Sequence, residues 1–182
     1  GMYKDDIDVC REIAKNQEKH GWPKYFQGIA GKNKKDQVLE AASIVKGSFL
    51  SAAVQTSNPE VLKNIKRDNV SHEQMVQVSH EAEAYGANSF SELIVGLPGE
   101  TKGNHIQSVL ELIDAEISVV RSHQFLMLPG AEASNQYTRE KFGLRTGFRV
   151  TPATFDDYHL FGESFFAPEI TEICVGSSSM SF

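Results

Sequence analysis

A chain of 182 residues with 40% hydrophobic and 23% charged residues is long enough and apolar enough to form a soluble globular domain with its own core. Its net charge of −6 argues against nucleic acid as the main partner, and since no apolar run approaches about 18 residues we expect no membrane-spanning segment. With two cysteines and no visible secretory signal, we expect reduced thiols and a cytoplasmic protein.

Helical and strand-like patterns alternate along the chain. Apolar spacing predicts helices over residues 4–20, 34–46, 59–67, 71–86 and from residue 100 onward, the last with Ile106, Val109, Leu110 and Ile113 as its apolar face. Short apolar runs predict strands over residues 25–29, 49–54, 89–95 and 119–128. Such alternation is typical of α/β folds with parallel strands and right-handed crossovers. About four units cannot close an eight-stranded barrel, and a chain that opens on a helix favours part of a larger barrel over a small open sheet.

The stretch from residue 89 to residue 101 is the most informative part of the chain. Its apolar residues 93–95 predict a buried strand, and Pro98 followed by Gly99 predicts a type II turn. Glu100 and Thr101 then stand where a helix begins. The free N–H groups of that first turn would point back over the strand end, which suits anionic or polar ligand groups.

Residues 133–182 carry no alternating pattern. They are rich in aromatic residues, glycine and proline, and the three serines 177–179 resemble a linker more than a nucleophile site. We therefore expect residues 1–132 to form the α/β part and residues 133–182 to be an extension or a linker towards a following domain.

Ligands of parallel α/β folds gather at the carboxyl ends of the strands. Here those ends are residues 27–33, 55–57, 96–101 and 128–132. Arg67 follows one short helix after the second of them, and an arginine can bind a carboxylate through two hydrogen bonds. The alternative is a solvated arginine in a run with Lys63 and Lys66.

Other motifs are weaker. A phosphate loop needs a second glycine where this chain has Thr101, so that motif is rejected. The histidines lack paired metal-ligand spacing and are read as core or surface residues: His72, His80, His105 and His123.

At this point the chain resembles a known family. The sequence Gly-Leu-Pro-Gly-Glu-Thr at 96–101, preceded by Ile94, is similar to the fifth-strand motif of radical S-adenosylmethionine (radical SAM) enzymes. Residues 54–67 resemble the fourth-strand region of that family, and residues 71–86 the helix after it. Lys32-Asn33 resembles a frequent pair after the third strand of that family. The strand that ends at residues 128–130 resembles its sixth strand. The match covers about residues 3–132 and is closest to the cobalamin-associated branch.

The resemblance implies about four units of a TIM-like partial (βα) barrel whose mouth holds SAM against a four-iron four-sulfur cluster. In that family, reductive cleavage of SAM gives a 5′-deoxyadenosyl radical that abstracts hydrogen from the substrate. Carried over to this sequence, Ile94, the Gly96 backbone and Leu128 would lie against adenine. Gln55 and Ser57 would contact the ribose or the methionine part, and Arg67 the methionine carboxylate.

Two departures from the family pattern matter. The Cys-x3-Cys-x2-Cys loop is absent, and three thiolates are needed to hold the cluster. We therefore expect this chain alone to be inactive, with the cluster and a cobalamin-binding domain supplied by upstream parts of the same parent chain. Glu92 and Gln55 also replace the usual glycine and the usual acid or serine.

Three readings remain open at this stage. The first is a fragment of a radical SAM enzyme, of the cobalamin-dependent methyltransferase or porphyrin cyclase type. The second is a non-catalytic α/β binding or scaffold module. The third is a barrel fragment that binds a phosphorylated metabolite at residues 96–101.

Overall fold

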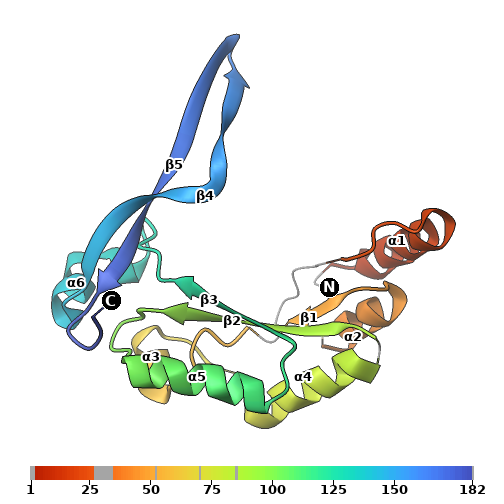
Figure 1. Ribbon diagram of the computed structural model, residues 1–182, viewed down its shortest axis with the longest axis horizontal. Coiled ribbons are helices and arrows are strands. Elements are labelled where there is room, and N and C mark those ends of the chain that lie inside the picture. Colours follow the sequence, from red (N-terminus) through yellow and green to blue (C-terminus); the bar gives the residue numbers. More distant parts are fainter. Residues whose placement is uncertain (1–2, 27–34, 52, 70, 85, 182) are drawn as a thin grey trace. The chain divides into compact units, whose positions relative to one another are not determined.

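The computed structural model describes residues 3–26, 35–51, 53–69, 71–84 and 86–181 (Figure 1). The chain divides into two compact units. The first contains Gly1–Ser57, Asn69–Leu93 and Ile106–Arg121, and the second contains Asn58–Asp68, Ile94–His105 and Ser122–Phe182. The predicted boundary at residue 132 does not coincide with this division, so a separate domain over residues 133–182 stays a prediction.

Three strands form one sheet in the order β1 (Phe49–Ser51), β2 (Asn88–Val95) and β3 (Val119–Gln124). β1 pairs with β2 in parallel, and a further parallel bridge joins Gln55 to Leu93. The hydrogen bonds between Ser89 and Ser118 and from the Phe125 N–H to the Val95 carbonyl keep nearly the same sequence offset. A constant offset means that β2 and β3 are also parallel, which confirms the prediction of parallel strands.

The predicted first strand falls mostly outside the described residues. Phe26 forms an isolated parallel bridge with Ser48, while residues 27–34, with the Lys32-Asn33 pair, are not described. The described residues establish a parallel α/β arrangement of three strands, and the partial barrel stays a prediction.

The helices begin and end largely where the sequence predicts. Their bounds are α1 (Asp6–His20), α2 (Lys35–Ile44), α3 (Pro59–Asn64), α4 (His72–Ala84), α5 (Lys102–Asp114) and α6 (Gln136–Phe142), with a short 3-10 helix η1 (Glu132–Ser134). Asn58 caps α3 by accepting the N–H groups of Glu60 and Val61. The Ser71 hydroxyl accepts the Gln74 N–H, and the Gln74 amide oxygen accepts the Ser71 N–H, which is the predicted capping box.

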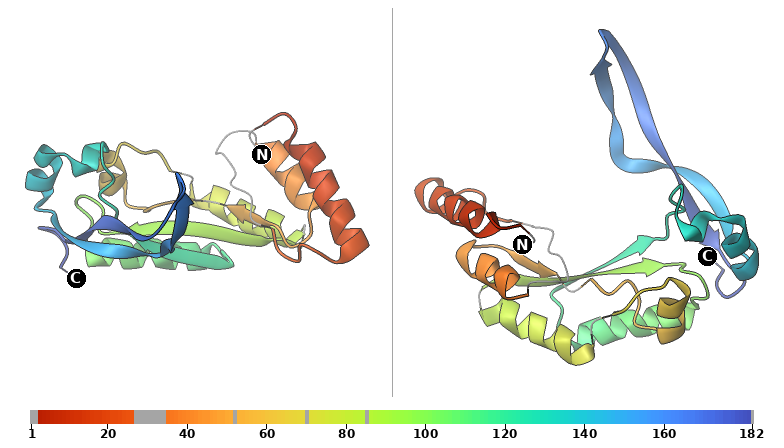
Figure 2. Two further views of the ribbon diagram at one scale, coloured as in Figure 1. Left: turned by 90° about the horizontal axis from the view of Figure 1, so that it is seen from above. Right: turned by 180° about the vertical axis from the view of Figure 1, so that it is seen from behind.

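The core of the first unit lies between its strands and the helices α4 and α5, which lie along one side of the sheet (Figure 2). Its buried side chains are Val54, Met75, Leu93, Leu112, Ala115 and Ile117. The predicted apolar face of α5 is confirmed for Val109, which packs against this core, and is wrong for Ile106, Leu110 and Ile113, which are 46–56% exposed while Ser108 and Leu112 are buried. The helix thus turns Ser108 and Leu112 inward.

The core of the second unit includes a part of the chain for which the sequence predicts an extension or a linker. β4 (Arg145–Leu160) and β5 (Glu163–Gly176) form a long antiparallel hairpin that turns at Phe161 and Gly162 (Figure 1). The Met127 N–H donates to the Glu172 carbonyl and the Cys174 N–H to the Phe125 carbonyl, both at 2.9 Å. The resulting apolar cluster consists of Val61, Leu97, Phe125, Met127 and Cys174.

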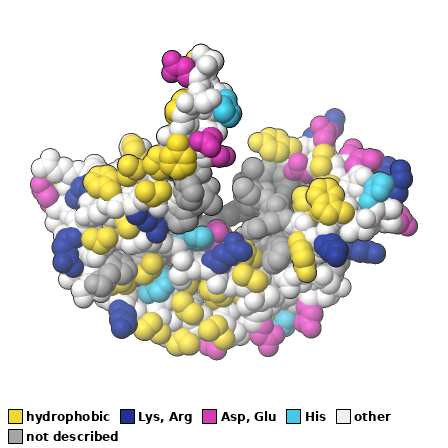
Figure 3. Space-filling view, turned by 45° about the horizontal axis from the view of Figure 1, so that its top comes forward, with side chains coloured by type: hydrophobic (Ala, Val, Ile, Leu, Met, Phe, Trp, Pro, Cys, Tyr) yellow, Lys and Arg dark blue, Asp and Glu magenta, His cyan; other side chains and the backbone are white. Residues whose placement is uncertain are grey.

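Many large apolar side chains of the hairpin are exposed. Figure 3 shows hydrophobic side chains on the surface of the protein. In the hairpin, Tyr158 and Phe165 are exposed and stack with ring centroids 5.8 Å apart. Across residues 156–168 of the hairpin, whose burial the structure describes, no side chain is buried, which explains why this part of the sequence lacks a clear alternation. In the described part of the chain, no helix combines the length and the hydropathy that crossing a membrane requires.

Candidate functional site

Residues 96–101, which we call the strand-end loop, connect β2 to α5. Gly96 and Gly99 have φ values of 90° and 82°, and the Glu100 N–H donates to the Leu97 carbonyl at 2.9 Å. These features confirm the predicted turn at Pro98 and Gly99. The Asn64 side chain donates to the Pro98 carbonyl at 3.0 Å and lies 2.7 Å from where a Gly99 Cβ would stand, so a side chain at this position would displace the Asn64 amide.

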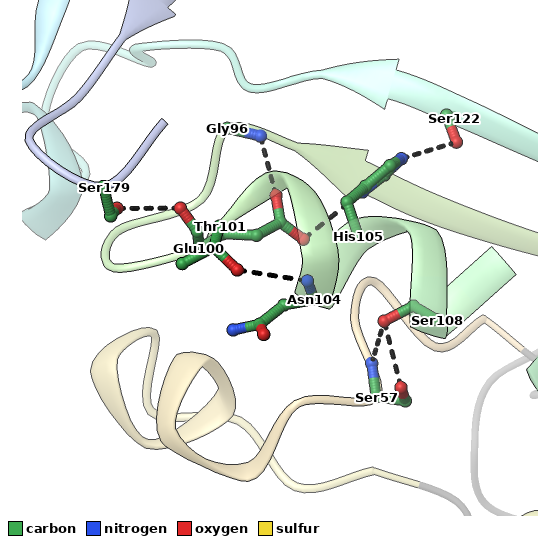
Figure 4. A network of polar contacts seen from close by, with 9 residues as sticks. All are labelled: Ser57, Gly96, Glu100, Thr101, Asn104, His105, Ser108, Ser122 and Ser179. Carbon is green, nitrogen blue, oxygen red and sulfur yellow. Dashed lines mark hydrogen bonds and ion pairs between the residues drawn. The ribbon is translucent and has the colours of Figure 1, made fainter. Parts of the chain in front are cut away.

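The centre of the strand-end loop is the Glu100 carboxylate, which is fully buried. Its Oε2 accepts the Gly96 N–H at 2.8 Å, and its Oε1 lies 3.3 Å from Nδ1 of His105 (Figure 4). Burial raises the pKa of Glu100, while the Gly96 N–H and His105 act in the opposite direction. The carboxylate therefore fixes the backbone of Gly96 from within the loop.

Hydrogen bonds to neighbouring segments extend this network (Figure 4). His105 is 15% exposed, and its Nε2 lies 3.1 Å from the Ser122 hydroxyl on β3. The Ser179 hydroxyl donates to the Glu100 carbonyl at 2.7 Å, and Thr101 Oγ1 accepts the Asn104 N–H at 3.1 Å. The loop is thus held by α5, β3 and the C-terminal segment of the second unit.

This arrangement does not favour a phosphate at the start of α5. The Glu100 carboxylate already takes the Gly96 N–H, and Thr101 takes the Asn104 N–H. A phosphate placed against the same loop would need the Gly96 N–H as a donor, but the Glu100 carboxylate already accepts it. The phosphate would also come close to this buried carboxyl group. The reading as a phosphometabolite-binding fragment is accordingly not favoured.

Four of the sequence-predicted site residues lie in the second unit: Arg67, Ile94, Gly96 and Leu128. Ile94 is partly buried and packs against the apolar cluster of this unit. The Leu128 side chain is 56% exposed, while its carbonyl accepts the Ala131 N–H at 3.1 Å and the Ser134 hydroxyl at 2.6 Å. Arg67 is exposed, and its backbone N–H donates to the Leu62 carbonyl.

The other two predicted site residues, Gln55 and Ser57, lie in the first unit. Gln55 has a φ of 62°, which is uncommon for a residue other than glycine, and its N–H donates to the Glu92 carbonyl at 2.8 Å. The N–H and the hydroxyl of Ser57 both lie 3.0 Å from the Ser108 hydroxyl (Figure 4). Because the candidates are divided between the units, a common site for all of them stays a prediction, and residues 27–33 lie outside the described part.

Sequence reasoning missed the pairing of Glu100 with His105. Glu100 was read only as the start of a helix, and His105 only as a core or surface histidine. The usable signal was an acidic residue just before a helix with a histidine five positions later, but such a pair becomes notable only when both side chains are buried.

The described residues do not fit an iron–sulfur cluster. Cys10 is buried in the first unit and Cys174 in the second, and burial raises the pKa of both thiols. Across the described ranges, no group of three His, Cys, Asp or Glu side chains could hold a metal ion. A four-iron four-sulfur cluster that leaves one iron open needs three thiolates, more than this chain has.

Comparisons with known proteins place the chain beside larger enzymes. No protein-family model matches it. It is 27% identical over 153 residues to a 2-(S-pantetheinyl)-carbapenam-3-carboxylate methyltransferase of Streptantibioticus cattleyicolor. It is 26% identical over 153 residues to the cobalamin-dependent radical SAM methyltransferase TokK of Streptomyces tokunonensis. In both cases the match covers 80% of this chain and 22% of the relative, so the chain spans about a fifth of the length of these relatives.

A similar solved structure is that of TsrM from Kitasatospora setae, a radical S-adenosylmethionine methyltransferase with tryptophan substrate and a SAM analogue bound. It has a TM-score of 0.47 and 14% sequence identity, and the match covers 81% of this chain and 30% of that one.

Proposed function

We propose that this chain, a relative of the cobalamin-dependent radical SAM methyltransferases, is part of an enzyme of that kind and contributes to the binding of S-adenosylmethionine. The observation that carries the proposal is the strand-end loop, where a parallel strand ends in a backbone held rigid by Glu100. Because this strand end is already rigid, binding an apolar ligand face against it does not cost the free energy of ordering a loop. We also propose that β1, β2 and β3 belong to a partial (βα) barrel.

The candidate residues have properties that suit the parts of SAM. Leu128 presents an exposed apolar side chain after β3, and Ile94 lies beside Gly96, so these three residues would form the surface for adenine. The exposed guanidinium of Arg67 would neutralise the methionine carboxylate. Gln55 and Ser57 would contact the ribose or the methionine part, since a hydroxyl that already bonds to Ser108 keeps further hydrogen-bonding capacity.

The chain would bind SAM without transforming it. The thiolates that an iron–sulfur cluster needs are lacking here, so we assign the cluster to other segments of a parent enzyme and derive no step through it. We propose the same for cobalamin. The partners of this chain would then be cluster-binding and cobalamin-binding domains of one parent protein, and the parent reaction a methyl transfer.

Binding can be measured directly by calorimetry of the chain with SAM. If Arg67 pairs with the carboxylate, Arg67→Ala weakens binding by about 1–3 kcal/mol, because one charge-assisted hydrogen-bonded pair is lost. Lys63→Ala is the matched control, since it removes a positive charge from an exposed residue of α3 one turn earlier. Equal affinity of the Arg67→Ala and unmodified chains would exclude the role of Arg67.

Two other outcomes decide between the readings. If SAM gives no heat with the unmodified chain while inorganic phosphate does, the phosphometabolite reading replaces this proposal. If neither ligand binds, the chain is a scaffold part of its parent protein and the SAM contacts lie elsewhere.

A further inference from the structure

Glu100 is a fully buried carboxylate next to a largely buried histidine. Among the described residues, His105 is the titratable side chain that contacts the carboxyl group of Glu100, and it acts on the pKa of Glu100 against the effect of burial. The two side chains stand on the same end of α5, with Oε1 of Glu100 and Nδ1 of His105 3.3 Å apart. A buried carboxylate without a cation or a proton costs free energy, so the protonation of Glu100 affects the stability of the strand-end loop.

The other elements packed against the pair contribute neutral groups. Ser122 on β3 contacts Nε2 of His105, Ser179 donates to the Glu100 carbonyl, and Asn64 from α3 donates to the Pro98 carbonyl. The titratable residues next in sequence to members of this network are all exposed: Lys63, Lys102, Arg121 and His123. The contacts that α3, β3 and the C-terminal segment make around Glu100 and His105 are therefore made by uncharged groups.

We propose that His105 is a positioning residue for the strand-end loop, because its Nδ1, 3.3 Å from Oε1 of Glu100, keeps the buried carboxyl group on the Gly96 N–H. When Glu100 loses its proton, a negative charge is left buried within the loop, and the loop loosens. This inference deepens the proposed function, and its consequence for SAM binding rests on that function.

The direction of the pH effect follows from the burial of Glu100. Since burial raises the pKa of Glu100, the folded loop binds more protons than the unfolded chain above the ordinary carboxyl range. The stability of the folded loop is therefore complete below the ordinary carboxyl pKa of 4.5 and falls as pH rises from there through the raised pKa of Glu100. Over this pH interval the folded loop gives up a proton that the unfolded chain has already lost. The loop is accordingly most ordered at mildly acid pH.

The test is amide hydrogen exchange at Gly96, measured by NMR on the chain between pH 5 and 9 and corrected for intrinsic exchange. In the unmodified chain we expect the protection of Gly96 to fall as pH rises. Glu100→Gln keeps an acceptor for the Gly96 N–H without a charge, so its protection should not vary with pH. His105→Gln should lower protection at neutral pH roughly 5- to 50-fold, as expected for a buried charge that loses its partner.

The double variant Glu100→Gln/His105→Gln tests whether His105 acts through the charge of Glu100 or only by packing in the loop. If His105 acts through the charge of Glu100, His105→Gln costs little in the Glu100→Gln background. If His105→Gln lowers protection equally in both backgrounds, or if the unmodified chain shows no pH dependence, the inference is overturned. His20→Gln is the control, since His20 is exposed at the end of α1 in the first unit.

Calorimetry with SAM at pH 6 and pH 8.5 connects the loop to ligand binding. We expect weaker binding at pH 8.5 for the unmodified chain and equal binding at both values for Glu100→Gln. If Gly96 responds to pH but SAM never binds, the positioning role stands and the proposed function fails. If SAM binds but Gly96 does not respond to pH, the proposed function stands and the positioning role fails.

Discussion

Arg139 and Glu172 illustrate how single residues hold the second unit together. The two guanidinium Nη atoms donate to the two carboxylate oxygens at 2.6 and 2.8 Å, which ties α6 to β5. These hydrogen bonds from Arg139, with one from Thr146, lower the pKa of Glu172 to about 2. The side chains are 29% and 19% exposed, so water reduces the strength of the pair without removing it.

The pH dependence of stability should reveal this ion pair. Because the folded pKa of Glu172 is lowered from 4.5 to about 2, the stability it adds is present above pH 4.5 and is lost as pH falls to about 2. Glu172→Gln should cost about 1–2 kcal/mol at neutral pH and flatten this part of the acid transition. Urea unfolding followed by circular dichroism at several pH values measures both effects.

Glu169→Gln is the matched control, because Glu169 is an exposed carboxylate on the same strand. Its removal should leave the acid transition unchanged. Equal acid transitions of Glu172→Gln and the unmodified chain would mean that the pair contributes no stability.

Among the helices, the sequence predicted correctly where helices begin, but it did not predict correctly which face of α5 is buried. The capping box at Ser71 and the cap at Asn58 lie where predicted, because each involves residues two or three positions apart. The buried face of α5 instead depends on the side chains of β2 and α4 in the same core, such as Leu93 and Met75. As a result its isoleucines at 106 and 113 are exposed, although their spacing suggested a core face.

The capping box of α4 gives a prediction at this scale. Ser71→Ala removes the acceptor of the Gln74 N–H and should lower the free energy of unfolding by about 1 kcal/mol. Ser71→Asp keeps an acceptor at the cap and should remain close to the unmodified chain. Thermal unfolding of the three proteins measures the difference, and an unaffected Ser71→Ala would show that the cap does not limit the stability of α4.

For the molecule as a whole, the segment after residue 132 is part of the fold of the second unit. β5 runs antiparallel beside residues 124–127, and Cys174 is fully buried among side chains from α3, the strand-end loop and the segment after β3. Removing the hairpin would expose this cluster and leave the Met127 N–H without the Glu172 carbonyl.

Shortening the hairpin in two ways tests this contribution. A chain that ends at Leu144 should lose about 2–4 kcal/mol from the second unit and the amide protection of Met127. A chain in which Asn-Gly replaces residues 156–167 keeps the pairs near the core, such as Phe148 with Glu172, and should retain that protection. Hydrogen exchange at Met127 distinguishes the two. Retained protection in the chain ending at Leu144 would contradict the role of β5.

The sequence by itself determined the helix ends, the turn at Pro98 and Gly99, the parallel order of the strands and the resemblance to radical SAM enzymes. These features depend on residues close in sequence, whose dihedral preferences and hydrogen bonds act locally. Only the tertiary structure decided the exposed face of α5, the pairing of β5 with residues 124–127 and the burial of Glu100 beside His105. Such features arise from the removal of water between distant segments, which no short stretch of sequence specifies.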